Sequence, residues 1–92
     1  MRLTYDPIKN AANIARRGLS FELVAEIDWD NALFREDTRK DYGERRMLVL
    51  GLIGPRLHVA VVTYRGDEVH VISLRKANQK EVMFYGQEVG SP

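Results

Sequence analysis

The sequence predicts a single α+β domain with a mainly antiparallel sheet. Three apolar segments, residues 45–53, 57–65 and 68–75, follow one another closely and are separated by residues that favour turns. Segments with helix start and stop signals lie on both sides of this strand-rich block. The 92 residues have room for one hydrophobic core and contain no repeat or linker. We therefore treat residues 1–92 as one domain.

The first predicted helix has clear start and stop signals. Residues 2–5 are expected to form a short strand, and residues 7–17 the helix that follows it. Asp6 can cap the N-terminus of this helix, and Pro7 suits the first position because its missing N–H would be unpaired there. Gly18 can adopt the left-handed conformation that ends a helix.

Basic side chains gather on one face of this helix. Lys9 and Asn13 are four residues apart, and Arg16 and Arg17 follow one turn later, so the spacing places them together. An ordinary solvated amphipathic helix explains the pattern as well as a binding surface does. The residues that can pack fall on another face: Ile8, Ala12 and Ala15.

Three further elements complete the prediction. Apolar spacing predicts a second helix over about 21–29, with Ser20 as its cap, and then a strand over 32–36 and a polar loop over 36–43. Residues 78–87 are rich in helix formers and predict a C-terminal helix. This last helix is expected to pack through Val82 and Phe84 or Tyr85.

Turn chemistry predicts how the three apolar strands pair. Gly54-Pro55-Arg56 and Gly66-Asp67 are typical of turns between strands, and the second fits a two-residue hairpin turn. Counting outward from it gives the register. The predicted pairs are Arg65 with Glu68, Tyr64 with Val69, Ala60 with Ser73, and His58 with Arg75.

Alternation along these strands predicts two faces of the sheet. The face expected to pack beneath the helices carries Leu48, Leu50, Leu52, Val59, Val61, Ile72 and Leu74. The other face, a candidate groove or an apolar surface awaiting a partner, carries Val49, Gly51, His58, Ala60, Val62, Tyr64, Ser73 and Arg75.

Composition excludes several classes of protein. The formal net charge of +1 alone does not indicate a nucleic-acid binder, although basic residues concentrate in residues 1–17 and acidic ones in residues 22–30. Without cysteine, the chain has neither disulfides nor thiolate metal sites. No segment is long and apolar enough for a membrane span, and no secretory signal is recognisable, so we expect a cytosolic protein.

Few catalytic motifs are compatible with the sequence. His58 and His70 lack carboxylate pairs at metal-ligand spacing, and glycine-rich phosphate loops and nucleophile elbows are absent. Metal-independent RNA cleavage is still possible, because the 2′-hydroxyl of RNA is itself the nucleophile. The protein then has only to orient the phosphate, stabilise charge and move protons. Arginine and lysine are suited to the first two tasks, because they place positive charge at the phosphate oxygens.

Four segments together resemble a known family. They are YDPIKNAANIARRGLSF at 5–21, YGERRMLVLG at 42–51, TYRGD at 63–67 and VISLRKANQKE at 71–81. In this order they are similar to BrnT-type toxins, the ribonucleases of the BrnT–BrnA toxin–antitoxin systems. The resemblance implies a RelE-like α+β fold, with N-terminal helices on one face of the sheet and a C-terminal helix. It also implies RNA cleavage that inhibits translation, with no cofactor.

Carried over position by position, the resemblance highlights specific residues. The chain departs from the family's common pattern at Arg17, where histidine is frequent, and at Val62, where histidine or tyrosine is common. Neither histidine of this chain therefore inherits a catalytic role. The matching positions are Asp6, Lys9, Asn13, Gly18, Phe21, Gly43, Glu44, Arg46, Gly51, Arg65, Ser73, Arg75, Ala77, Glu81 and Tyr85.

Each candidate site residue has a structural alternative. Glu44 can act as a general base or pair with Arg46, and surface ion pairs can equally occupy Arg46 and Arg65. Tyr85 can transfer protons, stack on a base or simply pack its helix. The predicted catalytic residues are Glu44, Arg46, Arg65, Arg75 and Tyr85, with Lys9, Arg17 and Lys76 binding RNA and no metal site.

The resemblance also implies a partner. A ribbon-helix-helix antitoxin similar to BrnA is expected to neutralise the chain in a heterotetramer and to supply the DNA contacts. The substrate is RNA, and no membrane is involved. The alternative function is a non-catalytic protein- or RNA-binding module, a degenerate member of the same family.

Overall fold

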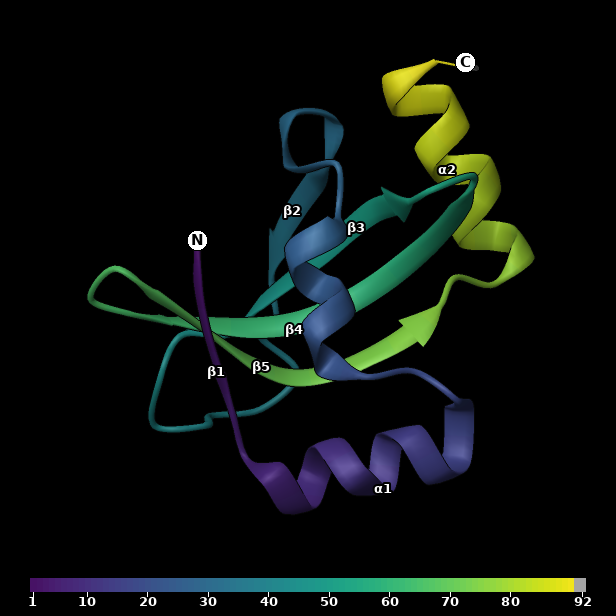
Figure 1. Cartoon of the computed structure of the whole chain (residues 1–92). Coiled ribbons are helices and arrows are strands. Elements are labelled where there is room, and N and C mark those ends of the chain that lie inside the picture. Colours follow the sequence, from purple (N-terminus) through teal and green to yellow (C-terminus); the bar gives the residue numbers. More distant parts are fainter. Residues whose placement is uncertain (91–92) are drawn as a thin grey trace.

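The computed structural model describes residues 1–90 and shows an α+β fold built on a five-stranded mixed sheet (Figure 1). The strand order is β1-β5-β4-β3-β2, with β1 parallel to β5 and the other neighbours antiparallel. The elements are β1 (Arg2–Tyr5), α1 (Pro7–Arg17), η1 (Phe21–Glu26), η2 (Trp29–Asn31), β2 (Leu33–Glu36), β3 (Met47–Ile53), β4 (Arg56–Arg65), β5 (Glu68–Lys76) and α2 (Gln79–Val89).

The predicted first helix is confirmed together with its caps. Asp6 Oδ1 accepts a hydrogen bond of 2.9 Å from the backbone N–H of Ile8, and Pro7 occupies the first turn. Gly18 ends α1 with φ 70°. The strand and C-terminal helix boundaries lie within two residues of those predicted. No helix within residues 1–90 is long and apolar enough to cross a membrane.

The second predicted helix is wrong in type. Residues 21–29 form two short 3₁₀ segments, η1 and η2, in place of one α-helix. The N–H of Ile27 bonds to the Val24 carbonyl three residues back, and the next N–H, that of Asp28, bonds to Leu52 O of β3 at 2.8 Å. This bond to the sheet prevents the α-helical pattern from continuing, since the same N–H would otherwise bond within the helix.

The predicted β4–β5 register is correct near the turn and wrong farther along. Arg65 pairs with Glu68 and Tyr64 with Val69, as expected from a two-residue turn. A bulge then breaks the register between Val61 and Val62, and the extra residue lies in β5. The structure pairs Ala60 with Leu74 and His58 with Lys76, not with Ser73 and Arg75.

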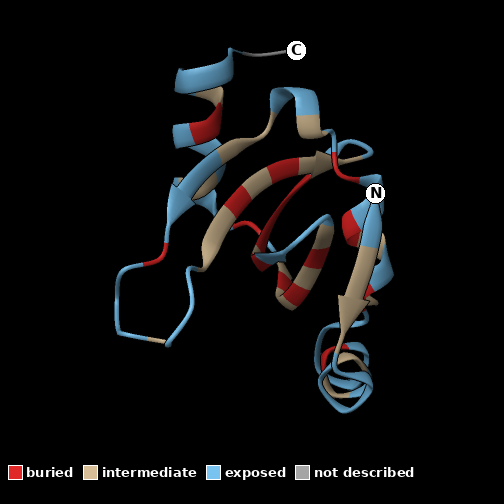
Figure 2. Ribbon diagram, turned by 90° about the vertical axis from the view of Figure 1, so that its left-hand side faces the viewer, coloured by how far each residue is buried: buried red, intermediate tan, exposed pale blue. Residues whose placement is uncertain are grey.

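The main core lies on the face that was predicted to be an open groove (Figure 2). Residues of η1 cover it, together with Ile27, which directly follows η1. Gly51 allows the close approach of Ile27, because a Cβ there would lie 2.5 Å from Ile27 Cγ2. Apolar side chains of η1 and of the sheet fill this face together, so no open groove is left there. Its fully buried members are Phe21, Val24, Val49, Ala60, Val62, Val71 and Leu74.

A second, smaller core lies on the opposite face, under α2. Leu57, Val59, Ala77 and Tyr85 are buried there, with Leu48, Leu50 and Leu52 packed against them. The Leu48 face therefore packs against α2 through Tyr85, whereas η1 lies on the opposite face of the sheet. Leu74 leaves this face because of the bulge. Of the side chains expected to pack α2, Tyr85 is buried, whereas Val82 and Phe84 are 45% and 51% exposed.

Candidate functional site

A cluster of polar residues lies on the α2 side of the sheet, at the end nearest the β4–β5 turn. Leu3 and Tyr5 pack in the main core, so Thr4 between them points to the opposite face. Thr4 is the β1 partner of His70, and Thr63 is the β4 partner of His70. Residues directly opposite in neighbouring strands share a face. Arg65, two residues beyond Thr63, lies on that face as well.

Glu44 lies between two arginines at this end of the sheet. Arg65 Nη2 is 3.4 Å from Glu44 Oε2, and Arg46 Nε is 3.9 Å from Glu44 Oε1. The predicted Glu44–Arg46 pair therefore exists, but its distance is too long for a hydrogen bond. Arg46 Nε is buried and has no hydrogen-bond partner among residues 1–90. The three side chains form a loose positive–negative–positive arrangement, which we call the Glu44 cluster.

The loop before β3 positions this cluster. Buried Asp37 accepts two hydrogen bonds of 2.9 Å from Arg39 and one of 3.2 Å from Tyr42. The bonds from Arg39 hold the pKa of Asp37 well below its usual range. The guanidinium of Arg46 stacks 4.0 Å from the ring centre of Tyr42, and the Thr63 hydroxyl donates to Arg45 O at 2.7 Å. A fixed loop thus presents Glu44 and Arg46 beside β4.

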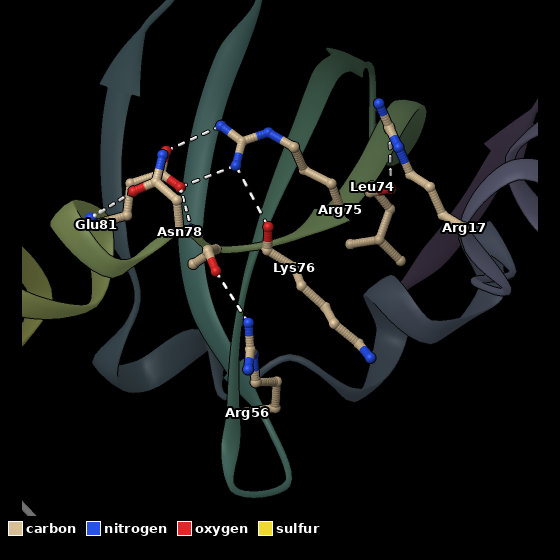
Figure 3. A network of polar contacts seen from close by, with 8 residues as sticks. Arg17, Arg56, Leu74, Arg75, Lys76, Asn78 and Glu81 are labelled. Atoms are coloured by element: carbon tan, nitrogen blue, oxygen red, sulfur yellow. Dashed lines mark hydrogen bonds and ion pairs between the residues drawn. The ribbon is translucent and has the colours of Figure 1, made fainter.

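Arg75 lies at the other end of β5 and is bound to the start of α2 (Figure 3). Its Nη1 and Nη2 each donate a 2.8 Å hydrogen bond to Glu81, one to each carboxylate oxygen. Glu81 also accepts from Asn78 N, and Asn78 Oδ1 accepts from Glu81 N, so the two residues form a capping box. The hydrogen bonds from Arg75 are the largest cause that lowers the pKa of Glu81.

A groove connects Arg75 with the loop before β3. Its volume is about 980 Å³, and it runs between β2 and α2. Leu48 and Leu50 are among its apolar lining residues. Its charged lining residues include four basic and four acidic side chains: Arg35, Arg39, Arg75 and Lys80, and Glu36, Asp37, Glu81 and Glu88. The groove is on the same side of the sheet as the Glu44 cluster. Arg75 can therefore contact a ligand held there only if the Glu81 carboxylate shares or releases its guanidinium.

The other candidate residues have separate surroundings. Tyr85 is buried, and its hydroxyl donates a 2.9 Å hydrogen bond to Asn31 O, so packing accounts for it. Burial raises the pKa of this hydroxyl. Arg17 donates to Asn13 Oδ1 at 3.2 Å and to Leu74 O at 3.3 Å, which ties α1 to β5. Lys9 and Lys76 are exposed.

The structure thus divides the predicted site into two groups. Arg65 lies beside Glu68 at the start of β5, whereas Arg75 follows seven residues later on that strand. At about 3.3 Å per residue, roughly 20 Å of strand separates them. Within residues 1–90, no group of three or more carboxylates and histidines has the arrangement of a metal site.

His70 was not among the predicted site residues, yet it lies in the polar cluster. Its Nδ1 is 2.9 Å from Thr4 Oγ1. Burial is the largest cause that lowers the pKa of His70, followed by the charge of Arg65, and Glu44 acts in the opposite direction. The position of His70 could have been predicted from the sequence. A two-residue turn at Gly66-Asp67 pairs His70 with Thr63, in the same register that pairs Arg65 with Glu68.

Comparison with protein families identifies the chain. Residues 5–81 match the model of the ribonuclease toxin BrnT of type II toxin–antitoxin systems. The chain belongs to the BrnT toxin family. The match covers the Glu44 cluster, His70, Arg75 and Glu81, and leaves Tyr85 outside. No curated protein sequence matches this BrnT-family chain. Its family is one of ribonuclease toxins, and a type II system implies an antitoxin as partner.

Proposed function

We propose that this BrnT-family chain is an endoribonuclease toxin that cleaves RNA without a metal ion and thereby inhibits translation and growth. The observation that carries the proposal is the Glu44 cluster: two arginine side chains approach one carboxylate at 3.4 and 3.9 Å. Both distances are longer than those of a tight charged pair, so the two guanidinium groups can bind an RNA phosphate in addition to the carboxylate. Family membership supplies the reaction class.

The proposed chemistry needs fixed charge and proton transfer. The RNA 2′-oxygen attacks the adjacent phosphorus, and the P–O5′ bond breaks. Arg65 and Arg46 stabilise the negative charge that develops on the phosphoryl oxygens. The groove with Arg75, together with Lys9 and Lys76, holds flanking phosphates. Tyr85 packs α2 and takes no part in the reaction.

Cleavage of a labelled single-stranded RNA by the purified chain tests the proposal. We expect fragments that end in a 2′,3′-cyclic phosphate, formed equally well in excess EDTA. An all-DNA oligonucleotide of the same sequence, which lacks 2′-hydroxyls, serves as the control and is expected to stay intact. Loss of cleavage in EDTA and its return with Mg²⁺ would contradict the metal-independent mechanism.

The proposed partner is a ribbon-helix-helix antitoxin, bound in a cytoplasmic heterotetramer with two copies of each chain. Membership of a family of type II toxins supports an antitoxin as the partner of this chain. We further propose that the antitoxin makes the DNA contacts, because the net charge of the chain is only +1. Mass measurement of a co-expressed pair tests the stoichiometry. Equal operator binding by the chain alone and by the pair would contradict this division of roles.

A non-catalytic binding module is the second candidate function. Two observations favour it: Glu81 occupies the guanidinium of Arg75, and Tyr85 is part of the core. A degenerate toxin of this kind would bind RNA or protein and cleave nothing. RNA binding without cleavage in the assay above, under conditions where the protein is folded, would support this function over the first.

A further inference from the structure

His70 is held in a defined orientation beside the Glu44 cluster. Its backbone is fixed between β1 and β4, through pairing with Thr4 and Thr63. Its Nδ1 lies 2.9 Å from Thr4 Oγ1. In the tautomer that protonates Nδ1, the ring donates this bond to Thr4 and the lone pair of Nε2 is available to a substrate. The side chain is half-buried on the same face as Arg65.

Charged groups from several elements surround this imidazole. Burial is the largest influence and disfavours the protonated form of the ring, as do the positive charges of Arg65 and Lys9. The negative charges of Glu44 and Asp6 favour the protonated form. The net result is a pKa below the usual value, so the ring is neutral at pH 7. A neutral imidazole accepts protons and is suited to general-base catalysis near neutral pH.

We infer that His70 is the general base of the reaction, taking the proton of the RNA 2′-hydroxyl while Arg65 holds the phosphate. This assignment rests on the proposed ribonuclease function. Glu44 faces arginines with both of its oxygens, which leaves His70 as the neighbouring acceptor. The role of Glu44 is then to position Arg65 and Arg46.

The proton and electron balance of the step is simple. The O2′–H bond breaks, and its proton passes to His70 Nε2 as O2′ bonds to phosphorus. The P–O5′ bond breaks with its electron pair on O5′, which takes a proton from water. His70 returns its proton to the resulting hydroxide. The products are a 2′,3′-cyclic phosphate and a free 5′-hydroxyl.

Cleavage of the labelled RNA over a range of pH by wild type and His70→Gln tests the assignment. Loss of a general base lowers kcat by about 10²–10⁴-fold. We expect the wild-type rate to rise with pH through an inflection below 6.5, the ordinary pKa of histidine, and the His70→Gln rate to lack this inflection. His58→Gln, whose ring is buried and faces Arg56 O, is the matched histidine control and should keep both rate and inflection.

Chemical rescue separates a proton-transfer role from a structural one. Imidazole added to His70→Ala should restore part of the rate, and it should not restore Arg65→Ala, which lacks fixed charge instead of a base. Circular dichroism confirms that each variant is folded. A folded His70→Gln with wild-type kcat, or His70→Ala without rescue, would overturn the assignment and leave the ribonuclease function standing. Absence of cleavage by the wild type would overturn both.

Discussion

Arg75 and Glu81 are joined by two parallel hydrogen bonds of 2.8 Å, and this pair links the end of β5 to the first turn of α2. The same guanidinium borders the groove between β2 and α2. Arg75, which was predicted to be a catalytic residue, is thus also bound to a residue of the capping box of α2. Its two roles can be separated by substituting its partner.

Arg75→Ala is expected to reduce RNA cleavage more than Glu81→Gln does. Both changes remove the bidentate ion pair, and each should lower the free energy of unfolding by about 1 kcal/mol, since the pair is partly exposed. Only Arg75→Ala also removes the charge proposed to bind RNA. Urea unfolding of both variants measures the loss of stability, and kcat/KM measures the loss of cleavage. Equal cleavage by the two variants would assign Arg75 a structural role alone.

Arg65→Ala is expected to lower kcat by about 10²–10³-fold, because removal of one charge-stabilising donor typically costs that much. Arg65→Lys should recover part of the loss, since a point charge cannot reproduce the planar fork of arginine. Arg16→Ala, on exposed α1 surface, is the control. Steady-state kinetics on the same labelled RNA give the comparison. Wild-type kcat for Arg65→Ala would remove this arginine from the site.

Stability is expected to fall in acid through Asp37. Its pKa is lowered on folding, so the ionised carboxylate stabilises the native state above the unfolded pKa of about 3.9. This contribution is lost as the pH falls below that value. Asp37→Asn should therefore be less stable than wild type at pH 7 and should show a weaker pH dependence below pH 4. Urea midpoints at several pH values measure both effects, and identical pH dependence in the two proteins would contradict the assignment.

Gly51→Ala is expected to destabilise the fold by about 1–3 kcal/mol, the usual cost of overpacking a core. The added Cβ would lie 2.5 Å from Ile27 Cγ2, and β3 or η1 must shift. Ile27→Ala removes the clashing atom, so the cost of Gly51→Ala should be smaller in that background. A double-mutant cycle by chemical denaturation measures this coupling. Additive effects of the two substitutions would show that the close approach does not limit stability.

Local signals in the sequence were sufficient for most elements and, near the candidate site, for the pairing of Glu44 with Arg46. Asp6, Pro7 and Gly18 defined α1, and the Gly66-Asp67 turn gave the pairing of Arg65 with Glu68. The bulge at Val61/Val62 adds one residue to β5 without a glycine at that point, so no local pattern in the sequence indicates it. This one irregularity moved Leu74 to the other core.

The candidate site shows the same limit. Glu44 and Arg65 are brought together by a loop whose course is set by buried Asp37, so sequence spacing could not give their distance. The bond of Arg75 to Glu81 was equally hidden, because it requires the start of α2 to turn back on β5. His70 was set aside because it lacks carboxylate partners at metal-ligand spacing and because the resemblance places the family's histidines at other positions. The strand register alone placed it near Arg65.

The parallel pairing of β1 with β5 determines when the chain can become active during its synthesis. Thr4 and His70 are hydrogen-bonded across 66 positions of sequence, and within residues 1–90 the only sheet neighbour of β1 is β5. β1 must therefore remain unpaired until β5 has been synthesised. A nascent chain that has not yet extruded β5 lacks His70 and the hairpin that orders Arg65. His70, Thr4 and Arg65 can therefore come together only after β5 has left the ribosome, and contacts of such long sequence separation form slowly.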